Sequence, residues 1–208
     1  MNPQGCQVYS FKAPSSEDLD HDFLWRVPRA ACPSAAASAS STAATTRKPL
    51  VVRAHPSCWP PRRYRRRLIG KRIWKERCED IVAVERYLAR NGVLIRKFFL
   101  HVSRDEQKRR FLERLDNPDK NWKFSANDAK ERGFWKDYME AYEDTIRRTA
   151  TPEAPWYVVP ADNKWFTRVV VAAAVIDALG SLGLEYPTVS AEKRKELTAA
   201  KRALVRGG

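Results

Sequence analysis

The feature that most restricts the fold is a nearly continuous apolar run at residues 93–102, with the sequence VLIRKFFLHV. Only two charged residues interrupt it, and such runs are typical of strands buried on both faces of a parallel sheet. A second apolar segment, Trp156 to Val159, has the same character. Because helical patterns separate and follow these segments, we predict an α/β fold with a doubly wound parallel sheet.

Helices are predicted in the segments around the two strands. They cover residues 70–91, 103–115, 164–179 and 191–205. The first ends at Gly92, a usual C-cap residue, and Ser103 is placed to cap the second. Near the amino terminus, Gln7 to Phe11 predicts a short strand, and Ser15 or Ser16 is placed to cap a helix after it.

A further helix is predicted to begin at Ser125, within the segment Leu115 to Tyr142. Ser125 caps the helix and Asp128 returns a hydrogen bond to the Ser125 N–H, a capping box with Asp in place of Glu. Large apolar residues then recur at steps of three and four and form one face. They are Phe134, Trp135, Tyr138, Tyr142 and Ile146. Asp128, Arg132 and Lys136 form a charged row at i, i+4 and i+8.

The loop before this helix interleaves two cations with a large ring, in the order Lys120, Trp122 and Lys123. Cations and rings in this arrangement suit a polyanion, so the loop and helix are interpreted as a phosphate-handling lid. The alternative is an ordinary amphipathic helix whose charged row is solvated, and the pattern alone favours that alternative.

Three stretches resemble family-2 polyphosphate kinases. They are NPQGCQVYSFKAPSSEDLDHDFLWRV at 2–27, LVVRAHP at 50–56, and a nearly unbroken run from GKRIWKER at Gly70 to PWYVVPADNKWFTR at 155–168. The resemblance implies a P-loop-kinase fold and phosphoryl transfer between inorganic polyphosphate and nucleotides, with Mg²⁺ as cofactor. It also places a basic helical lid at residues 103–148.

Two family features do not occur in these 208 residues, the Gly-rich phosphate loop and the second motif after a central strand. We therefore expect an incomplete fold that is truncated at the amino terminus and lacks one central strand. Retained activity is then uncertain, and an inactive phosphotransferase domain is the expectation. The resemblance also implies a division into four regions: a βα remnant at 1–29, an aberrant or disordered insert at 30–69, the kinase-like domain at 70–190, and a helical tail at 191–208.

The insert differs in composition from its surroundings. Residues 30–48 consist largely of Ala, Ser and Thr, and residues 56–67 are rich in Arg and Pro. One hypothesis is that residues 32–48 and 57–66 are out-of-frame translations. Pro33 to Lys48, written in GC-rich codons and read in the neighbouring register, gives PERGRIGIFNRSYYEE, which contains the Asn-Arg-Ser-Tyr-Tyr motif of the family. A flexible linker and a basic loop are the alternative.

Four basic residues are candidates for binding polyphosphate or nucleotide, because phosphoryl transfer requires positive charge around the phosphate oxygens. They are Lys123, Arg132, Arg53 and Lys164. The resemblance to the family lid supports the first two. Arg53 follows a predicted strand, and Lys164 begins a helix, where Asp162 could instead pair with it. No catalytic residue and no metal ligand is assigned.

The formal charge of +14 favours anionic partners, but it does not distinguish phosphate chains from nucleic acid. The arginines at 62–67 support a nucleic-acid-binding alternative, and a non-enzymatic polyphosphate- or nucleotide-binding remnant is another. The four Cys and three His residues form no zinc or disulfide pattern. No membrane span or signal peptide is recognised, so we expect a cytoplasmic protein, with homo-oligomers possible.

Overall fold

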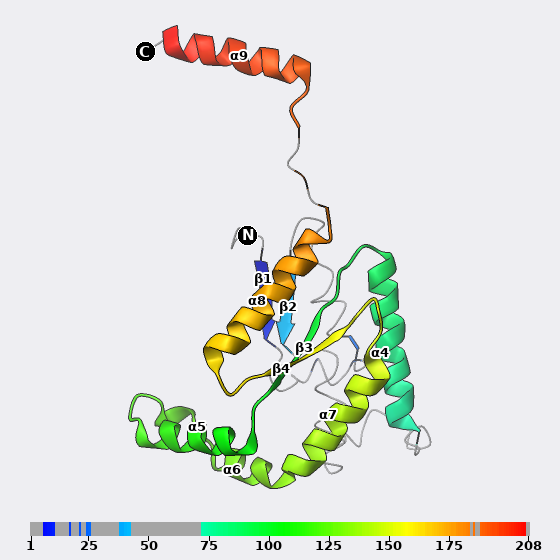
Figure 1. Cartoon of the computed structure of the whole chain (residues 1–208), viewed down its shortest axis with the longest axis vertical. Helices are drawn as coiled ribbons and strands as arrows, with labels where there is room; N and C mark the ends of the chain where they lie inside the picture. The colour runs from blue at the N-terminus through cyan, green and yellow to red at the C-terminus, as the bar shows by residue number, and fades with distance from the viewer. Residues whose placement is uncertain are drawn as a thin grey trace. The chain divides into compact units, whose positions relative to one another are not determined.

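The computed structural model describes residues 6–10, 17, 21, 24–25, 38–42, 72–183, 185 and 188–206. Within them, parallel strand pairs and helices form a mixed α/β fold (Figure 1). Of the predicted helix after Ser15, Glu17 is helical, His21 lies in a bend, and Leu24 and Trp25 lie in a turn. The other residues of that helix, and the predicted strand before Arg53, lie outside the described residues.

Strands β3 (Lys97–His101) and β4 (Trp156–Pro160) pair in parallel, with Lys97 opposite Trp156 and His101 opposite Pro160. Both predicted apolar segments therefore contain a strand. The expected burial on both faces is not met, because Leu100 is 49% exposed and Val158 is 58% exposed. In the described part of the chain, these two strands form a sheet of their own, so fewer elements cover them than cover a central strand.

A second parallel pair joins β1 (Cys6–Ser10) to β2 (Ser38–Thr42), with Val8 opposite Ser40. Strand β2 lies inside the insert at 30–69 that was predicted to be disordered or aberrant, and these five residues form a strand. The physical reason is that a strand is held by backbone hydrogen bonds to its neighbour, which small residues make as well as large ones. The other residues of 30–69 lie outside the described part.

Helix α4 (Ile73–Arg90) ends as predicted. Gly92 has φ of 83°, its N–H donates to the Ala89 carbonyl, and the Val93 N–H donates to the Leu88 carbonyl. These two bonds make a Schellman motif, which requires a left-handed residue at Gly92. One face of α4 is buried and contributes Cys78, Ile81 and Leu88 to the core.

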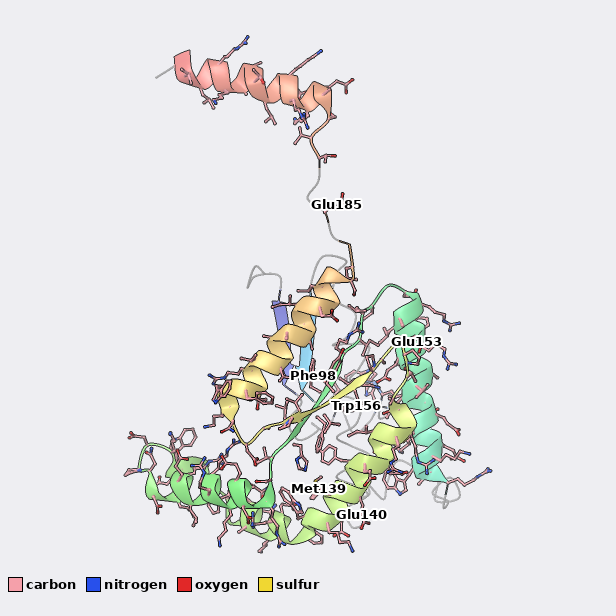
Figure 2. The ribbon with its side chains drawn as sticks, in the orientation of Figure 1. Phe98, Met139, Glu140, Glu153, Trp156 and Glu185 are labelled. Carbon is pink, nitrogen blue, oxygen red and sulfur yellow. The ribbon has the colours of Figure 1, made fainter. Side chains whose placement is uncertain are left out.

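Helix α7 (Trp135–Thr149) lies beside α4 (Figure 1) and buries Ala141, Thr145 and Thr149. Trp156, at the start of β4, lies near the end of α7 (Figure 2), and its Nε1 donates to the Thr149 hydroxyl at 2.9 Å. Part of the core therefore lies where these two helices meet the amino-terminal ends of β3 and β4, and Val159, near the carboxyl end of β4, is also fully buried.

The predicted lid forms a helical hairpin followed by α7. Helix α5 (Arg104–Asp116) leads through a 3-10 turn, η4 (Asn121–Lys123), to α6 (Ala126–Glu131) and a second 3-10 turn, η5 (Arg132–Phe134). The expected single helix from Ser125 is thus divided, and the chain changes direction before α7 (Figure 1). Gly133 lies in the break, and glycine is a weak helix former.

The chain divides into two compact units, residues 1–171 and 172–208. Helix α8 (Lys164–Gly180) begins in the first unit, and α9 (Ala191–Arg206), which lies in the second, is exposed along its length. The predicted carboxy-terminal helix is confirmed. Among the described residues, no helix is both long enough and apolar enough to cross a membrane.

Candidate functional site

The candidate site lies at the carboxyl edge of the β3–β4 sheet. His101 ends β3, Pro160 ends β4, and the next N–H, that of Ala161, donates to the His101 carbonyl at 2.8 Å. Two helices begin close to this edge, α5 after Ser103 and α8 at Lys164. In open parallel sheets, ligands bind at this edge because the strand ends and the following helix starts converge there.

Helix α5 is capped as the sequence predicts. The Ser103 hydroxyl accepts a hydrogen bond from the Glu106 N–H at 3.2 Å. The Ser103 N–H donates in turn to Asp162 Oδ1 at 2.7 Å. The start of the lid is therefore hydrogen-bonded to the loop that follows β4.

A second connection joins the same two segments. Arg110 Nη2 donates to the carbonyl oxygens of Ala161 and Asp162, each at 2.8 Å, and Arg110 Nε donates to Glu106 at 2.7 Å. Arg109 also donates to Glu106, through Nε and Nη2, both at 2.6 Å. Glu106 thus holds two adjacent guanidinium groups, of which Arg110 contacts the β4–α8 loop.

These arginines lower the pKa of Glu106 to about 2, mainly through the Arg109 hydrogen bond, and the same pairing raises the pKa of Arg109. The carboxylate is therefore ionised at any physiological pH. An ionised Glu106 also lies in the first turn of α5, where the helix dipole favours negative charge.

Lys164 is exposed and is the first residue of α8. The alternative that Asp162 pairs with it is wrong for the described structure, because Asp162 instead accepts from Ser103 and no ion pair joins Asp162 to Lys164. The first N–H groups of an α-helix have no partner within the helix and attract phosphate oxygens. Lys164 adds a full positive charge at that position.

Arg132 lies at the junction of α6 and η5, and it contacts α5. Its Nη1 donates to the Arg104 carbonyl at 2.7 Å and to Gln107 Oε1 at 2.9 Å. These contacts place Arg132 beside the first turn of α5. Both bonds come from one nitrogen of the guanidinium group, and Arg132 makes no ion pair with another described residue. The predicted cation therefore lies near the sheet edge, and it also holds the lid helices together.

The capping box at Ser125 is confirmed. The Ser125 hydroxyl accepts from the Asn127 N–H at 3.2 Å, and Asp128 Oδ2 accepts from the Ser125 N–H at 3.3 Å. Lys123 lies in η4, beyond the end of α5, but its side chain is outside the described part of the structure, as is all of Arg53. Of the four predicted cations, the structure therefore brings Arg132 and Lys164 to the sheet edge.

Arg110 and Glu106 were not predicted as site residues. Nothing in the local sequence pattern distinguishes Arg110 from Arg109. The structure separates them, since 23% of the Arg110 side chain is exposed and 63% of the Arg109 side chain is exposed. A carboxylate one turn before an arginine is the only local signal, and it is common on solvated helices.

The described residues do not form a dedicated magnesium site. No group of three or more His, Cys, Asp or Glu residues within them is placed to hold a metal ion. Asp162 is the carboxylate that directly follows β4, and one of its oxygens already accepts the Ser103 N–H. The remaining Asp162 oxygen alone does not supply the several ligands that a metal site needs, so no step of the chemistry is assigned to a metal.

Comparisons with known proteins agree on one family. The family model described as polyphosphate kinase 2 matches residues 66–185. An ADP-polyphosphate phosphotransferase of Rhodopseudomonas palustris is 42% identical over 207 residues, which cover 99% of this chain and 71% of the relative. An AMP/ADP-polyphosphate phosphotransferase of Meiothermus ruber is 39% identical over 187 residues, which cover 90% of this chain and 66% of the relative.

The crystal structure of polyphosphate kinase 2 from Arthrobacter aurescens superposes with a TM-score of 0.84 at 37% sequence identity, and the match covers all of this chain and 68% of that one. The family model spans more than half of the chain, and the relatives are similar over most of it. The chain therefore belongs to the polyphosphate kinase 2 family, a family of transferases that act on polyphosphate and nucleotides.

Proposed function

We propose that this chain is a phosphotransferase domain for inorganic polyphosphate and a nucleoside mono- or diphosphate, and that it binds these polyanions at the carboxyl edge of the β3–β4 sheet. The observation that carries the proposal is the convergence at that edge of two helix starts with Lys164 and Arg132. Phosphoryl transfer depends on positioning and on positive charge, and these groups supply both.

Each cation has a distinct part in this proposal. Lys164 neutralises phosphate at the start of α8, and the Arg132 nitrogens that are not bonded to α5 donate to a phosphate on the lid side. Lys123, in η4, binds the polyphosphate chain. We propose that Mg²⁺ arrives with the substrate phosphates, because Mg²⁺ in phosphoryl-transfer sites is commonly bound by one or two carboxylates together with substrate and water.

We propose further that the 208 residues as they stand bind polyphosphate but do not complete the transfer. They contain no G-x-x-x-x-G-K-[ST] segment, because no two of the eight glycines are five positions apart. The backbone donors and Lys of such a loop stabilise the transferred phosphoryl group, and each donor of this kind is typically worth about 100-fold or more in rate.

The out-of-frame hypothesis for residues 32–48 also accounts for a strand at the position of β2. Its residues, Ser38–Thr42, read SASST and carry no large apolar side chain, yet they form a strand. When these positions are written in GC-rich codons and read in the neighbouring register, they give Ile-Gly-Ile-Phe-Asn, in which Ile and Phe are residues that strands favour. The nucleotide sequence of the gene tests the hypothesis, and a stop codon in that register would refute it.

The test of the function uses the purified chain with polyphosphate, Mg²⁺ and ADP. We expect no transfer above a mock purification, and we expect polyphosphate binding that weakens steeply with salt. If the purified chain transfers phosphate and Lys123→Ala abolishes that activity, the proposed inactivity is wrong. The lid and the sheet edge would then be sufficient for phosphoryl transfer.

The binding site is tested with matched lysine variants. Lys164→Ala should lower the affinity for polyphosphate and reduce the slope of log K against log salt by about 0.7–0.9, the value for one lost contact by analogy with nucleic acids. Lys75→Ala is the control, because Lys75 is exposed on α4, outside the lid, and pairs with Glu79 one turn away. Two results together would favour the nucleic-acid alternative. RNA of equal charge would bind as tightly as polyphosphate, and the Arg65→Ala/Arg66→Ala variant would lose the binding of both polymers.

A further inference from the structure

The lid begins at a point where two separate connections join it to the β4–α8 loop. The first is the bond from the Ser103 N–H to Asp162 Oδ1, and the second is the pair of bonds from Arg110 to the Ala161 and Asp162 carbonyls. These residues lie 59, 51 and 52 positions apart in the sequence. Neither connection is therefore a consequence of local helix geometry.

Both connections reach the same short segment, the β4–α8 loop, from two different positions along the axis of α5. Ser103 is the N-cap of α5, and Arg110 lies about two turns further along the helix. Two attachment points separated along an axis restrain the direction of a helix, whereas a single point leaves it free to pivot. Glu106, between them, orients the Arg110 guanidinium through Nε.

In both connections, Asp162 is a hydrogen-bond acceptor. One carboxylate oxygen accepts a backbone N–H, the Asp162 carbonyl accepts from Arg110, and the side chain makes no ion pair with a described residue. A neutral amide at this position retains the same accepting oxygen, because Asn differs from Asp by an NH₂ group in place of one oxygen. The role of Asp162 can therefore be separated from the role of its charge.

We propose that Asp162 and Arg110 are positioning residues that fix the direction of the lid relative to the start of α8, and thereby the place where Lys164 and Arg132 meet a phosphate chain. Arg132 is bonded to the first turn of α5, and Lys164 lies two residues after Asp162. A change in the direction of α5 therefore moves one cation relative to the other. Neither positioning residue needs to touch the substrate.

The functional part of this inference rests on the proposed polyphosphate binding. The structural part is tested independently, by amide hydrogen exchange. In the whole chain, Asp162→Ala should remove protection of the Ser103 N–H, while Asp162→Asn should keep it. The Ala161 N–H, which donates to the His101 carbonyl, is the internal reference and should keep its protection in both variants.

The functional arm measures affinity for inorganic polyphosphate. Asp162→Ala and Arg110→Ala should each weaken binding, by roughly tenfold for a lost hydrogen bond to a charged group. Asp162→Asn should bind like the wild type. Arg109→Ala is the matched control for Arg110→Ala, because both arginines pair with Glu106 and the β4–α8 loop is contacted by Arg110.

Each further outcome decides between explanations. A loss in Asp162→Asn equal to that in Asp162→Ala would overturn the proposal, because it would show that the charge matters, as in a metal ligand. Equal losses in Arg109→Ala and Arg110→Ala would also overturn it, since they would reflect general charge loss. If the wild type binds no polyphosphate, the proposed function fails, and the exchange of the Ser103 N–H still decides whether Asp162 fixes the start of the lid.

Discussion

The ammonium group of Lys97 lies 2.6 Å from the Glu85 carboxylate, and both side chains are almost fully buried, with 10% and 6% of their surface exposed. Lys97 also donates to the Thr149 carbonyl at 2.6 Å and lies 5.2 Å from the centre of the Trp156 ring. One charged pair thus joins α4, α7 and both strands of the sheet. Burial lowers the pKa of Lys97 and raises the pKa of Glu85, and the hydrogen bond between them partly offsets each shift.

Removal of one partner of this pair should destabilise the fold strongly. Lys97→Met leaves the Glu85 carboxylate buried without a cation, and such losses typically cost about 3–5 kcal/mol. The double variant Glu85→Leu/Lys97→Met should recover most of the loss, because replacement of a buried ion pair by apolar residues is often neutral. Urea unfolding measures both, and a double variant less stable than the single one would contradict the argument.

The Glu85 carboxyl should titrate above its ordinary value of 4.5 in the folded chain. Between 4.5 and the raised pKa, the folded state binds more protons than the unfolded state, so the contribution of this group to stability falls as pH rises through that window. Side-chain carbon chemical shifts followed by NMR against pH measure the pKa directly. A value at or below 4.5 would show that the ion pair outweighs burial.

Glu106 should show the opposite dependence on pH. Its folded pKa of about 2 lies below the ordinary 4.5, so its stabilising contribution is complete above 4.5 and is lost as pH falls towards about 2. Urea midpoints of the wild type and Glu106→Gln should therefore converge as the pH is lowered through this range. A difference between them that stays constant from pH 5 to pH 2 would assign the effect to packing and not to charge.

Two glycines should respond oppositely to alanine. Gly92 has φ of 83°, and no atom lies within 4 Å of an added Cβ, so the cost of Gly92→Ala is that of the left-handed backbone alone, about 1 kcal/mol. Gly133 lies in the 3-10 turn η5 with φ outside the left-handed region, and its surroundings are equally open, so Gly133→Ala should stabilise the fold by about 0.4–1 kcal/mol. Thermal unfolding of the two variants beside the wild type checks both signs.

The sequence predicted those features that depend on neighbours within about four positions. The Schellman end at Gly92, the cap at Ser103 and the capping box at Ser125 all formed as expected, because each is a set of hydrogen bonds within one turn. The continuous helix from Ser125 was not borne out, and Gly133 was the local signal against it. Family membership was also recognisable, since it depends on the order of residues and not on their contacts.

The tertiary structure decided which charges have partners and which edge of the sheet they reach. Local spacing treats Arg109 and Arg110 alike, yet the second donates to carbonyls 51 and 52 positions away. Arg132 was selected as a phosphate ligand, and its bonds to α5 span 28 and 25 positions. Lys97 appeared as an interruption of an apolar run, and it pairs with Glu85 in the core. The physical reason is that a long charged side chain takes its partner from whatever the fold brings within a few ångströms, and the packing of helices and strands sets that distance.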